Sequence, residues 1–448
     1  MSGNQRYFDT HEFIEIVDFF LDNNENLKAE KAINASLSQH PYSIDLQVRK
    51  ADWLYETSNY EESEELVDLI LELDSNNADA LELKGDLLIN RGEEKQGVLY
   101  LQKALHGSEE KTEILSKIGI ELLQMNMVEE SLQFFLKILD LDIEDESALY
   151  NATYCFELLS RPEDAINFLT KYIDRSPYNQ IAWHQLGLQY VAVKDYKRAL
   201  NAFDYAIIVD DTFLGAYYEK AKCYEEQDEF EKAIEIYKYV QTLADPTAWA
   251  FFRLGQNFES LLNTDQALTN YFNAIHEDPM YASAWHAIAR VYISAGELEK
   301  ALEYAEKAVD IEFDNVSFNI LLANLLMKLS RFEDADNIYD NLISLEVDDP
   351  QVWIEYSILL KFLDQEKEAI ELLLGALAYF PENVEVLYRL AGLMFNSGRE
   401  MEGIDYLRSA MNVDYDKLSI LKISFPKVYD SELVQDLIFA YKHHGKFL

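Results

Sequence analysis

The side chains with the clearest chemical potential in this chain are its histidines and its two cysteines. His184 and His286 are far apart in the sequence, and so are Cys155 and Cys223, whereas a metal site or an activated nucleophile needs such groups within bonding distance. The pair His443–His444 could bind a metal only weakly. The sequence has no G-x-x-x-x-G-K-[ST] phosphate loop, no G-x-S-x-G elbow and no H-E-x-x-H metal helix. We therefore expect a non-enzymatic protein without a cofactor or a metal.

Carboxylates dominate the composition, since 82 Asp and Glu against 38 Lys and Arg give a formal net charge of −44. This charge argues against nucleic acid or an anionic membrane surface as the main partner, because both would be repelled. The 448 residues are 49% hydrophobic, enough to bury a large core. Two cysteines make no disulfide framework, and neither a signal peptide nor a membrane-spanning run is visible. We expect a cytoplasmic protein.

A repeat of 34 residues organises the chain. A frame that starts at Thr10 holds to residue 417 without insertion or deletion, and it defines twelve units that begin at 10, 44, 78, 112, 146, 180, 214, 248, 282, 316, 350 and 384. The twentieth residue of every unit is small, and so is the eighth residue in all but the first and fifth units. Small residues at two fixed positions let two helices cross closely.

Apolar residues recur at helical spacing in two blocks of each unit. We therefore predict that each unit is a helix, a tight turn, a second helix and a short loop. Serines followed three residues later by Glu have the form of a capping box and predict where the second helices start. These serines are Ser58, Ser160, Ser294, Ser330 and Ser397.

The pattern resembles the tetratricopeptide repeat family. The family's Trp, Leu, Gly, Tyr, Ala, Phe and Ala are matched in the unit from 180 by Trp183, Leu186, Gly187, Tyr190, Ala199, Phe203 and Ala206. The resemblance implies an all-α fold, an α-solenoid in which stacked helix-turn-helix units form a right-handed superhelix. It also implies that Trp183 and Tyr190 are packing residues. We further expect Cys155 and Cys223 to be small core residues.

The domain organisation expected from this frame has three parts. Residues 1–9 are an N-terminal extension, residues 10–417 are twelve units in one continuous array, and residues 418–448 are a C-terminal capping helix and tail. The residue usage also indicates a bacterial chain, similar to those of the Bacteroidetes.

In this family the first helices line a concave surface, and the second, fifth, ninth, twelfth and thirteenth residues of a unit tend to face it. In the first five units these positions carry ten acids and no Lys or Arg, and so predict an acidic wall: Asp18, Asp22, Asp45, Asp52, Glu56, Asp79, Glu82, Asp86, Glu113 and Glu157. The middle units supply an aromatic and polar ladder, formed by Tyr150, Tyr154, His184, Tyr218, Lys222, Trp249, Phe252, Arg253, Gln256, His286, Arg290 and Asn324. Aromatic side chains beside amides and cations suit an extended peptide. The alternative is that all these side chains merely solvate the inner wall.

We therefore expect an interaction scaffold that binds an extended segment of a partner protein in its concave groove, with the acidic wall favouring basic residues. Two alternatives remain open. One is a regulatory receptor for a short signalling peptide. The other is an assembly subunit that self-associates with an unused groove, using exposed apolar residues such as Phe425, Tyr429 and Phe447. The carboxylate clamp of the family's co-chaperones is absent, so binding of a chaperone tail is not expected.

Overall fold

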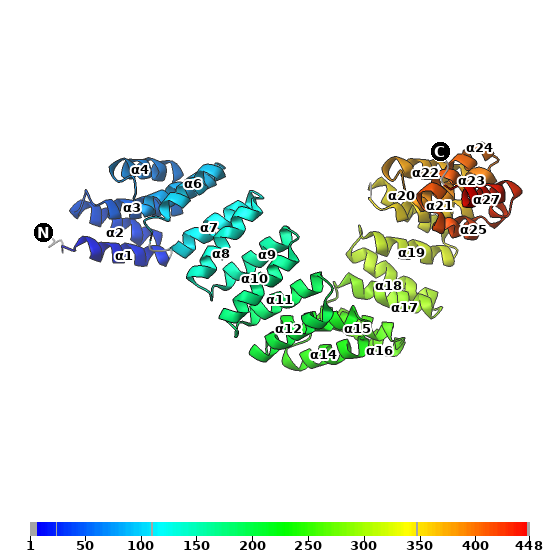
Figure 1. The fold of residues 1–448 in the computed structure, drawn as a ribbon, viewed down its shortest axis with the longest axis horizontal. Helices are drawn as coiled ribbons and strands as arrows, with labels where there is room; N and C mark the ends of the chain where they lie inside the picture. The colour runs from blue at the N-terminus through cyan, green and yellow to red at the C-terminus, as the bar shows by residue number, and fades with distance from the viewer. Residues whose placement is uncertain (1–6, 24, 109–110, 346–347, 446–448) are drawn as a thin grey trace. The chain divides into compact units, whose positions relative to one another are not determined.

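The computed structural model describes residues 7–23, 25–108, 111–345 and 348–445, and these residues form helices and connecting loops without a strand. The chain divides into two compact units, residues 1–227 and 228–448, which we call the N-terminal part and the C-terminal part. Each is a series of antiparallel helix pairs (Figure 1). No described helix is both long enough and apolar enough to cross a membrane.

The helices of the N-terminal part are α1 (Thr10–Asp22), α2 (Asn26–Gln39), α3 (Ile44–Glu56), α4 (Tyr60–Leu73), α5 (Ala78–Asn90), α6 (Glu94–Ala104), α7 (Lys111–Gln124), α8 (Val128–Leu141), α9 (Glu146–Leu158), α10 (Pro162–Arg175), α11 (Gln180–Ala192), α12 (Tyr196–Val209) and α13 (Leu214–Glu225). Those of the C-terminal part are α14 (Phe230–Leu243), α15 (Ala248–Ser260), α16 (Thr264–Glu277), α17 (Ala282–Ser294), α18 (Leu298–Ile311), α19 (Val316–Lys328), α20 (Phe332–Ser344), α21 (Pro350–Phe362), α22 (Glu366–Tyr379), α23 (Val384–Asn396), α24 (Glu400–Val413), the 3-10 helix η1 (Tyr415–Leu418), α25 (Ser419–Ser424), α26 (Pro426–Tyr429) and α27 (Glu432–His444).

The predicted all-α fold of stacked helix pairs is confirmed. The first helix of each pair starts on the 34-residue frame, apart from α7, which starts one residue early at Lys111. The small eighth residue allows the close crossing that the sequence predicts. A Cβ atom added to Gly187 would lie 2.4 Å from the ring of Phe203, and one added to Gly255 would lie 2.4 Å from the ring of Tyr271. The predicted burial of Cys155 and Cys223 is also confirmed, and both are free thiols.

The turn between the two helices of a unit differs from the prediction. Ser58, Ser160 and Ser330 do not cap the second helices, but adopt left-handed backbone with φ of 62°, 54° and 61°. Ser294 is the last residue of α17, and Ser397 follows the end of α23. The predicted capping boxes are therefore wrong. The reason is that only three residues join the two helices, so the fifteenth residue of the unit must take a positive φ to reverse the chain.

This positive φ recurs in each of the eleven units whose fifteenth residue the structure describes. The residues are Ser58, Gly92, Asn126, Ser160, Lys194, Asp228, Leu262, Gly296, Ser330, Asp364 and Gly398. Most side-chain caps are found instead at the start of first helices, where for example Asn77, Asn179 and Asn383 accept hydrogen bonds from backbone N–H groups. Among the second helices, Asp195 caps α12 and Asn263 caps α16. The Asn, Asp and Thr residues before first helices are thus the true helix starts.

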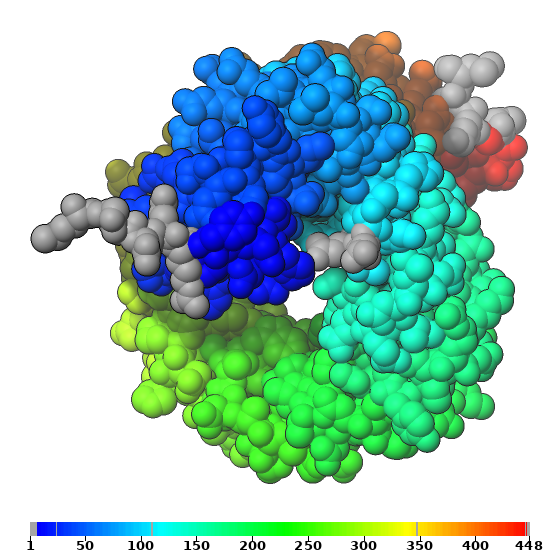
Figure 2. Space-filling view, turned by 90° about the vertical axis from the view of Figure 1, so that its left-hand side faces the viewer, coloured from blue at the N-terminus to red at the C-terminus, as the bar shows by residue number. Residues whose placement is uncertain are grey.

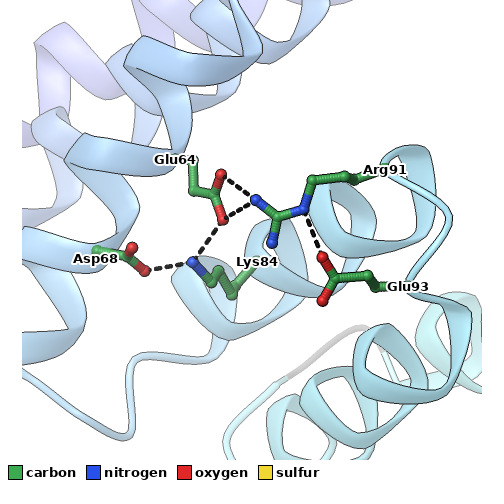
Figure 3. Close-up of polar contacts among 5 residues, drawn as sticks. All are labelled: Glu64, Asp68, Lys84, Arg91 and Glu93. Atoms are coloured by element: carbon green, nitrogen blue, oxygen red, sulfur yellow. Dashed lines mark hydrogen bonds and ion pairs between the residues drawn. The ribbon is translucent and has the colours of Figure 1, made fainter.

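Ion pairs connect successive units in addition to the apolar core. The side chain of Lys84 on α5 is only 10% exposed, and its Nζ lies 2.9 Å from Glu64 and 2.6 Å from Asp68 on α4 (Figure 3). Arg91 binds the same Glu64 at 2.9 Å. Lys220 and Asp204 form the equivalent pair at 2.5 Å between α13 and α12. Carboxylates on second helices therefore hold the first helix of the next unit.

The C-terminal segment is a broken helix pair, with its first helix interrupted at Pro426 between α25 and α26. Phe425 is not an exposed contact residue as the self-association alternative requires: it is 4% exposed and lies against Gly392. Lys361 lies 3.7 Å from its ring centroid and donates a hydrogen bond to the Ser424 carbonyl. The break at Pro426 ends α25 and leaves Phe425 within the core. Tyr429 is half-buried, and Phe447 lies outside the described residues.

Replacement of Leu262 by Gly tests the strain at the fifteenth position. Leu262 is 89% exposed and has φ of 57°, so its side chain contributes little packing while its backbone is strained. We expect Leu262→Gly to raise the free energy of unfolding by roughly 0.5–1 kcal/mol, because glycine adopts a positive φ without steric penalty.

Chemical denaturation monitored by circular dichroism would measure this change. The matched control is Leu345→Gly at an exposed leucine with φ of −81°, where the same substitution should lower stability by a similar amount. A loss of stability in both variants would contradict the assignment of strain to Leu262.

Candidate functional site

A hollow lies on the first helices α1, α3, α5 and α7 of the N-terminal part. Its volume is about 660 Å³. In the space-filling view of Figure 2, the residues of these helices are coloured from blue to cyan. We call this hollow the acidic groove; it is lined by Asp18, Leu21, Asp22, Val48, Arg49, Asp52, Tyr55, Glu56, Asp79, Glu82, Leu83, Asp86, Gly107, Ser108, Glu113 and Lys117.

The structure brings together most of the carboxylates of the predicted acidic wall. Eight of the ten predicted residues line the groove: Asp18, Asp22, Asp52, Glu56, Asp79, Glu82, Asp86 and Glu113. Asp45 does not line it, because it lies exposed in the first turn of α3. Glu157 on α9 also lies elsewhere and accepts a hydrogen bond from Gln189 at 3.3 Å. The wall therefore spans the first four units, not five.

Two cations in this groove, Arg49 and Lys117, were not predicted from the sequence. Nε of Arg49 on α3 lies 2.8 Å from Asp18 on α1, and its Nη1 lies 2.9 Å from Asp79 on α5. Each cation is the sixth residue of its unit, a position left out of the placement that we took from the family. The sixth residue of a unit lies one helical turn from the second and ninth residues, on the same face of the helix. Its charge could therefore have been predicted to face the groove.

Lys117 forms the ion pairs at the other end of the groove. Its Nζ on α7 lies 2.6 Å from Glu82 and 3.2 Å from Asp86, both on α5, and 3.8 Å from Glu113 on its own helix. Burial lowers the pKa of Lys117, but these carboxylates outweigh that effect and raise it above its ordinary value. Arg49 and Lys117 thus cross-link four successive first helices through carboxylates.

Three groove carboxylates, those of Asp22, Asp52 and Glu56, have no ion-pair partner among the described residues. Burial, with a further contribution from Glu56, raises the pKa of Asp52 to about 6. Burial also raises the pKa of Glu82 and Asp86, even though Lys117 acts in the opposite direction. Eight carboxylates against two cations leave the groove strongly negative and short of positive charge.

A second hollow of about 440 Å³ continues the acidic groove past Lys117. It shares Tyr55, Glu56, Asp86 and Lys117 with the groove and adds Ile89, Asn90, Ile120 and Glu121. Ile120 is 41% exposed, and Oε2 of Glu121 is buried without a hydrogen-bond partner in the described chain. The two isoleucines therefore add apolar surface to the acidic lining here.

The predicted ladder is divided between the two parts of the chain. In the N-terminal part, Tyr150 and Tyr154 are 43% and 51% exposed, whereas Tyr218 is half-buried. Lys222 is half-buried and lies 2.7 Å from Glu219. The ring of His184 packs 5.2 Å from that of Phe213, and both of its nitrogens are buried without a partner in the described chain. Burial lowers the pKa of His184, so it is a neutral packing residue at pH 7.

In the C-terminal part the ladder residues contact one another or the adjacent helices. Trp249 lies edge-to-face with Tyr237 at 6.0 Å, and Phe252 lies 5.4 Å from Tyr281. His286 stacks on Phe318 at 4.7 Å, and burial lowers its pKa to about 4. These contacts occupy aromatic surface that the prediction assigned to a ligand.

The polar members of the ladder also have internal partners. Arg253 donates a hydrogen bond to Gln256 at 3.1 Å, Arg290 pairs with Glu259, and Asn324 accepts one from the Tyr339 hydroxyl at 3.2 Å. Their role in binding stays a prediction. No group of three or more His, Cys, Asp or Glu side chains that could hold a metal ion occurs in the described ranges.

Replacement of Asp52 by Asn tests the electrostatics of the groove. A carboxyl whose pKa rises to about 6 on folding destabilises the folded state above that pH, and protonation removes this penalty as the pH falls. We expect Asp52→Asn to raise the free energy of unfolding by about 1–2 kcal/mol at pH 8 and by much less at pH 4.

Denaturation at the two pH values would measure this difference. Asp45→Asn, at the exposed start of the same helix α3, removes one charge outside the groove and should change stability little at either pH. An equal gain from both substitutions would show that only the net charge matters.

Models of the tetratricopeptide repeat match residues 184–247, 252–315 and 293–354. A TPR repeat-containing protein of Methanocaldococcus jannaschii is 24% identical over 78% of this chain and 66% of its own length. A BBSome complex member of Bos taurus is 21% identical over 75% of this chain and 67% of its own. This chain thus spans just under two thirds of the first relative.

Among solved structures, a tetratricopeptide repeat protein from Parabacteroides merdae is 17% identical, with a TM-score of 0.40 over 56% of this chain and 99% of that one. The APC/C hetero-tetramer Cut9–Hcn1 is 14% identical, with a TM-score of 0.40 over 83% of this chain and 88% of that one. The repeat models and the named relatives agree with the helix pairs that recur every 34 residues. The chain is a tetratricopeptide repeat array protein.

Proposed function

We propose that this chain is a non-enzymatic interaction scaffold whose acidic groove binds an extended, basic segment of a partner protein. The observation that carries the proposal is the charge of the groove, where eight carboxylates face two cations around a hollow of about 660 Å³. One relative is named as a member of the BBSome complex, which is in keeping with a role in protein assembly.

The unpaired carboxylates define what the partner must supply. Asp52 is half-buried and repelled by Glu56, and its pKa is raised, so its charged form is poorly compensated in the free protein. A Lys or Arg side chain placed between Asp52 and Glu56 would relieve that repulsion and form charge-assisted hydrogen bonds. The negative groove would also attract such a segment over a distance and speed its association.

The apolar residues of the groove fit the same kind of partner. Leu21, Val48, Leu83 and Tyr55 lie among the carboxylates. Lys and Arg carry long hydrocarbon stems that pack on apolar surface while their charged ends reach carboxylates. An extended backbone with several such side chains would therefore use both kinds of lining residue. We extend this surface within the N-terminal part to the exposed Tyr150 and Tyr154.

We also place the scaffold in a reducing compartment, the cytoplasm. Both cysteines are buried as free thiols, and neither takes part in a disulfide. Burial raises the pKa of both thiols, so neither is activated as a nucleophile.

Peptide binding tests the proposal directly. A fluorescent peptide of alternating Lys and Ser should bind at low salt, and the same peptide with Glu in place of Lys should not. The double variant Asp52→Asn/Glu56→Gln should weaken the binding of the Lys peptide by about tenfold, as measured by fluorescence anisotropy.

The matched control is Glu65→Gln/Glu72→Gln, which removes the same net charge from exposed positions on α4, outside the groove. This variant should bind the Lys peptide about as well as the original chain. Equal weakening by both variants would mean that the peptide senses only the total charge, and the groove would lose its role.

A further inference from the structure

An exposed phenylalanine occupies a position in the C-terminal part where the fold does not need one. Phe362 is the thirteenth residue of its unit, ends α21 and is 63% exposed. Nine of the twelve units carry a polar residue at this position: Asp22, Glu56, Asn90, Gln124, Glu226, Ser260, Ser294, Lys328 and Asn396. Since those units form the same helix pairs, the fold does not require an aromatic side chain at this position.

Phe362 borders a hollow of about 370 Å³, which we call the phenylalanine hollow. Its other lining residues are Asn324, Met327 and Lys328 at the end of α19 and Phe332 at the start of α20. The rings of Phe332 and Phe362 are 5.0 Å apart. Met327 and Phe332 also pack against the buried core of this region. The hollow thus has an anchored apolar floor and one exposed aromatic wall.

The polar residues at the edge of this hollow add a charge preference. Lys328 is exposed and, within the described part of the chain, has no carboxylate in ion-pair contact. Asn324 accepts a hydrogen bond from Tyr339 through Oδ1. The edge of the hollow therefore presents a positive charge, whereas the acidic groove presents negative ones.

We propose that the phenylalanine hollow docks a large aliphatic side chain of a partner protein, next to an Asp or Glu of the partner that pairs with Lys328. A leucine, isoleucine or methionine side chain would cover Phe362 and Met327, and the burial of that apolar surface would supply most of the affinity. The neighbouring carboxylate follows from charge complementarity with Lys328. This surface is separate from the acidic groove, and the chemistry that it selects is different.

Selection from a library of random peptides on the immobilised full chain tests this proposal. We expect one enriched class to combine Leu, Ile or Met with an adjacent Asp or Glu. Phe362→Ser should lose this class, and should weaken a synthetic peptide from it by roughly tenfold or more. Serine occupies the same position in two other units, at Ser260 and Ser294, so the variant should keep its helical content and melting temperature.

Charge reversal at Lys328, on the edge of the phenylalanine hollow, provides a second test in the same selection. Peptides selected on the Lys328→Glu variant should keep the aliphatic side chain but carry Lys or Arg in place of the neighbouring Asp or Glu. Unfolding of the variant would not produce this exchange. Asp52→Asn/Glu56→Gln should leave this class unchanged, so that failure here is distinct from failure of the acidic groove. The proposal is overturned if the class is absent, if Phe362→Ser retains it, or if Phe362→Ser instead lowers the solution mass of a self-associated chain.

Discussion

The reversal of the chain within each unit constrains the rest of this structure. Three residues join the two helices, or four between α13 and α14, and the fifteenth residue of the unit takes a positive φ in every unit where it is described. Glycine, asparagine and aspartate meet this requirement at low steric cost, but serines such as Ser58, together with Lys194 and Leu262, meet it as well. Because the reversal keeps a nearly constant length, the small eighth residue always meets the second helix at the same place.

This constant geometry also aligns the chemistry of successive units. First helices that start on one frame place their ninth residues, such as Asp52 and Asp86, along one side of the array. A residue type that recurs in several units therefore forms a continuous surface, whereas a residue type found at that position in one unit alone stands out. The acidic groove is of the first kind. The phenylalanine hollow, formed around Phe362, is of the second, because the other units show what the fold itself requires there.

The period and the small residues were enough to predict the helix pairs, because both follow from packing that every unit must repeat. The helix starts were harder to predict. A serine three residues before a glutamate suits a capping box, but at Ser58 and Ser160 the same serine lies at the reversal and adopts a positive φ. The eight carboxylates of the groove were predicted from their repeat positions. Arg49 and Lys117 were missed because the placement taken from the family did not include the sixth residue. Phe425 was predicted to be exposed because the sequence does not reveal that the chain folds back over Gly392.

The cross-links made by Arg49 and Lys117 have a mechanical consequence. Asp18 and Asp79 belong to helices on either side of the helix that carries Arg49, and the pairs between them resist separation of α1, α3 and α5. A cationic segment in the groove would compete with the chain's own cations for these carboxylates. Occupancy and stiffness of the N-terminal part are therefore linked, since a ligand contact to one of these paired carboxylates withdraws it from a contact between units. Salt screens both the ion pairs to the ligand and the ion pairs between the units. A higher salt concentration would therefore weaken ligand binding and make the N-terminal part less stiff at the same time.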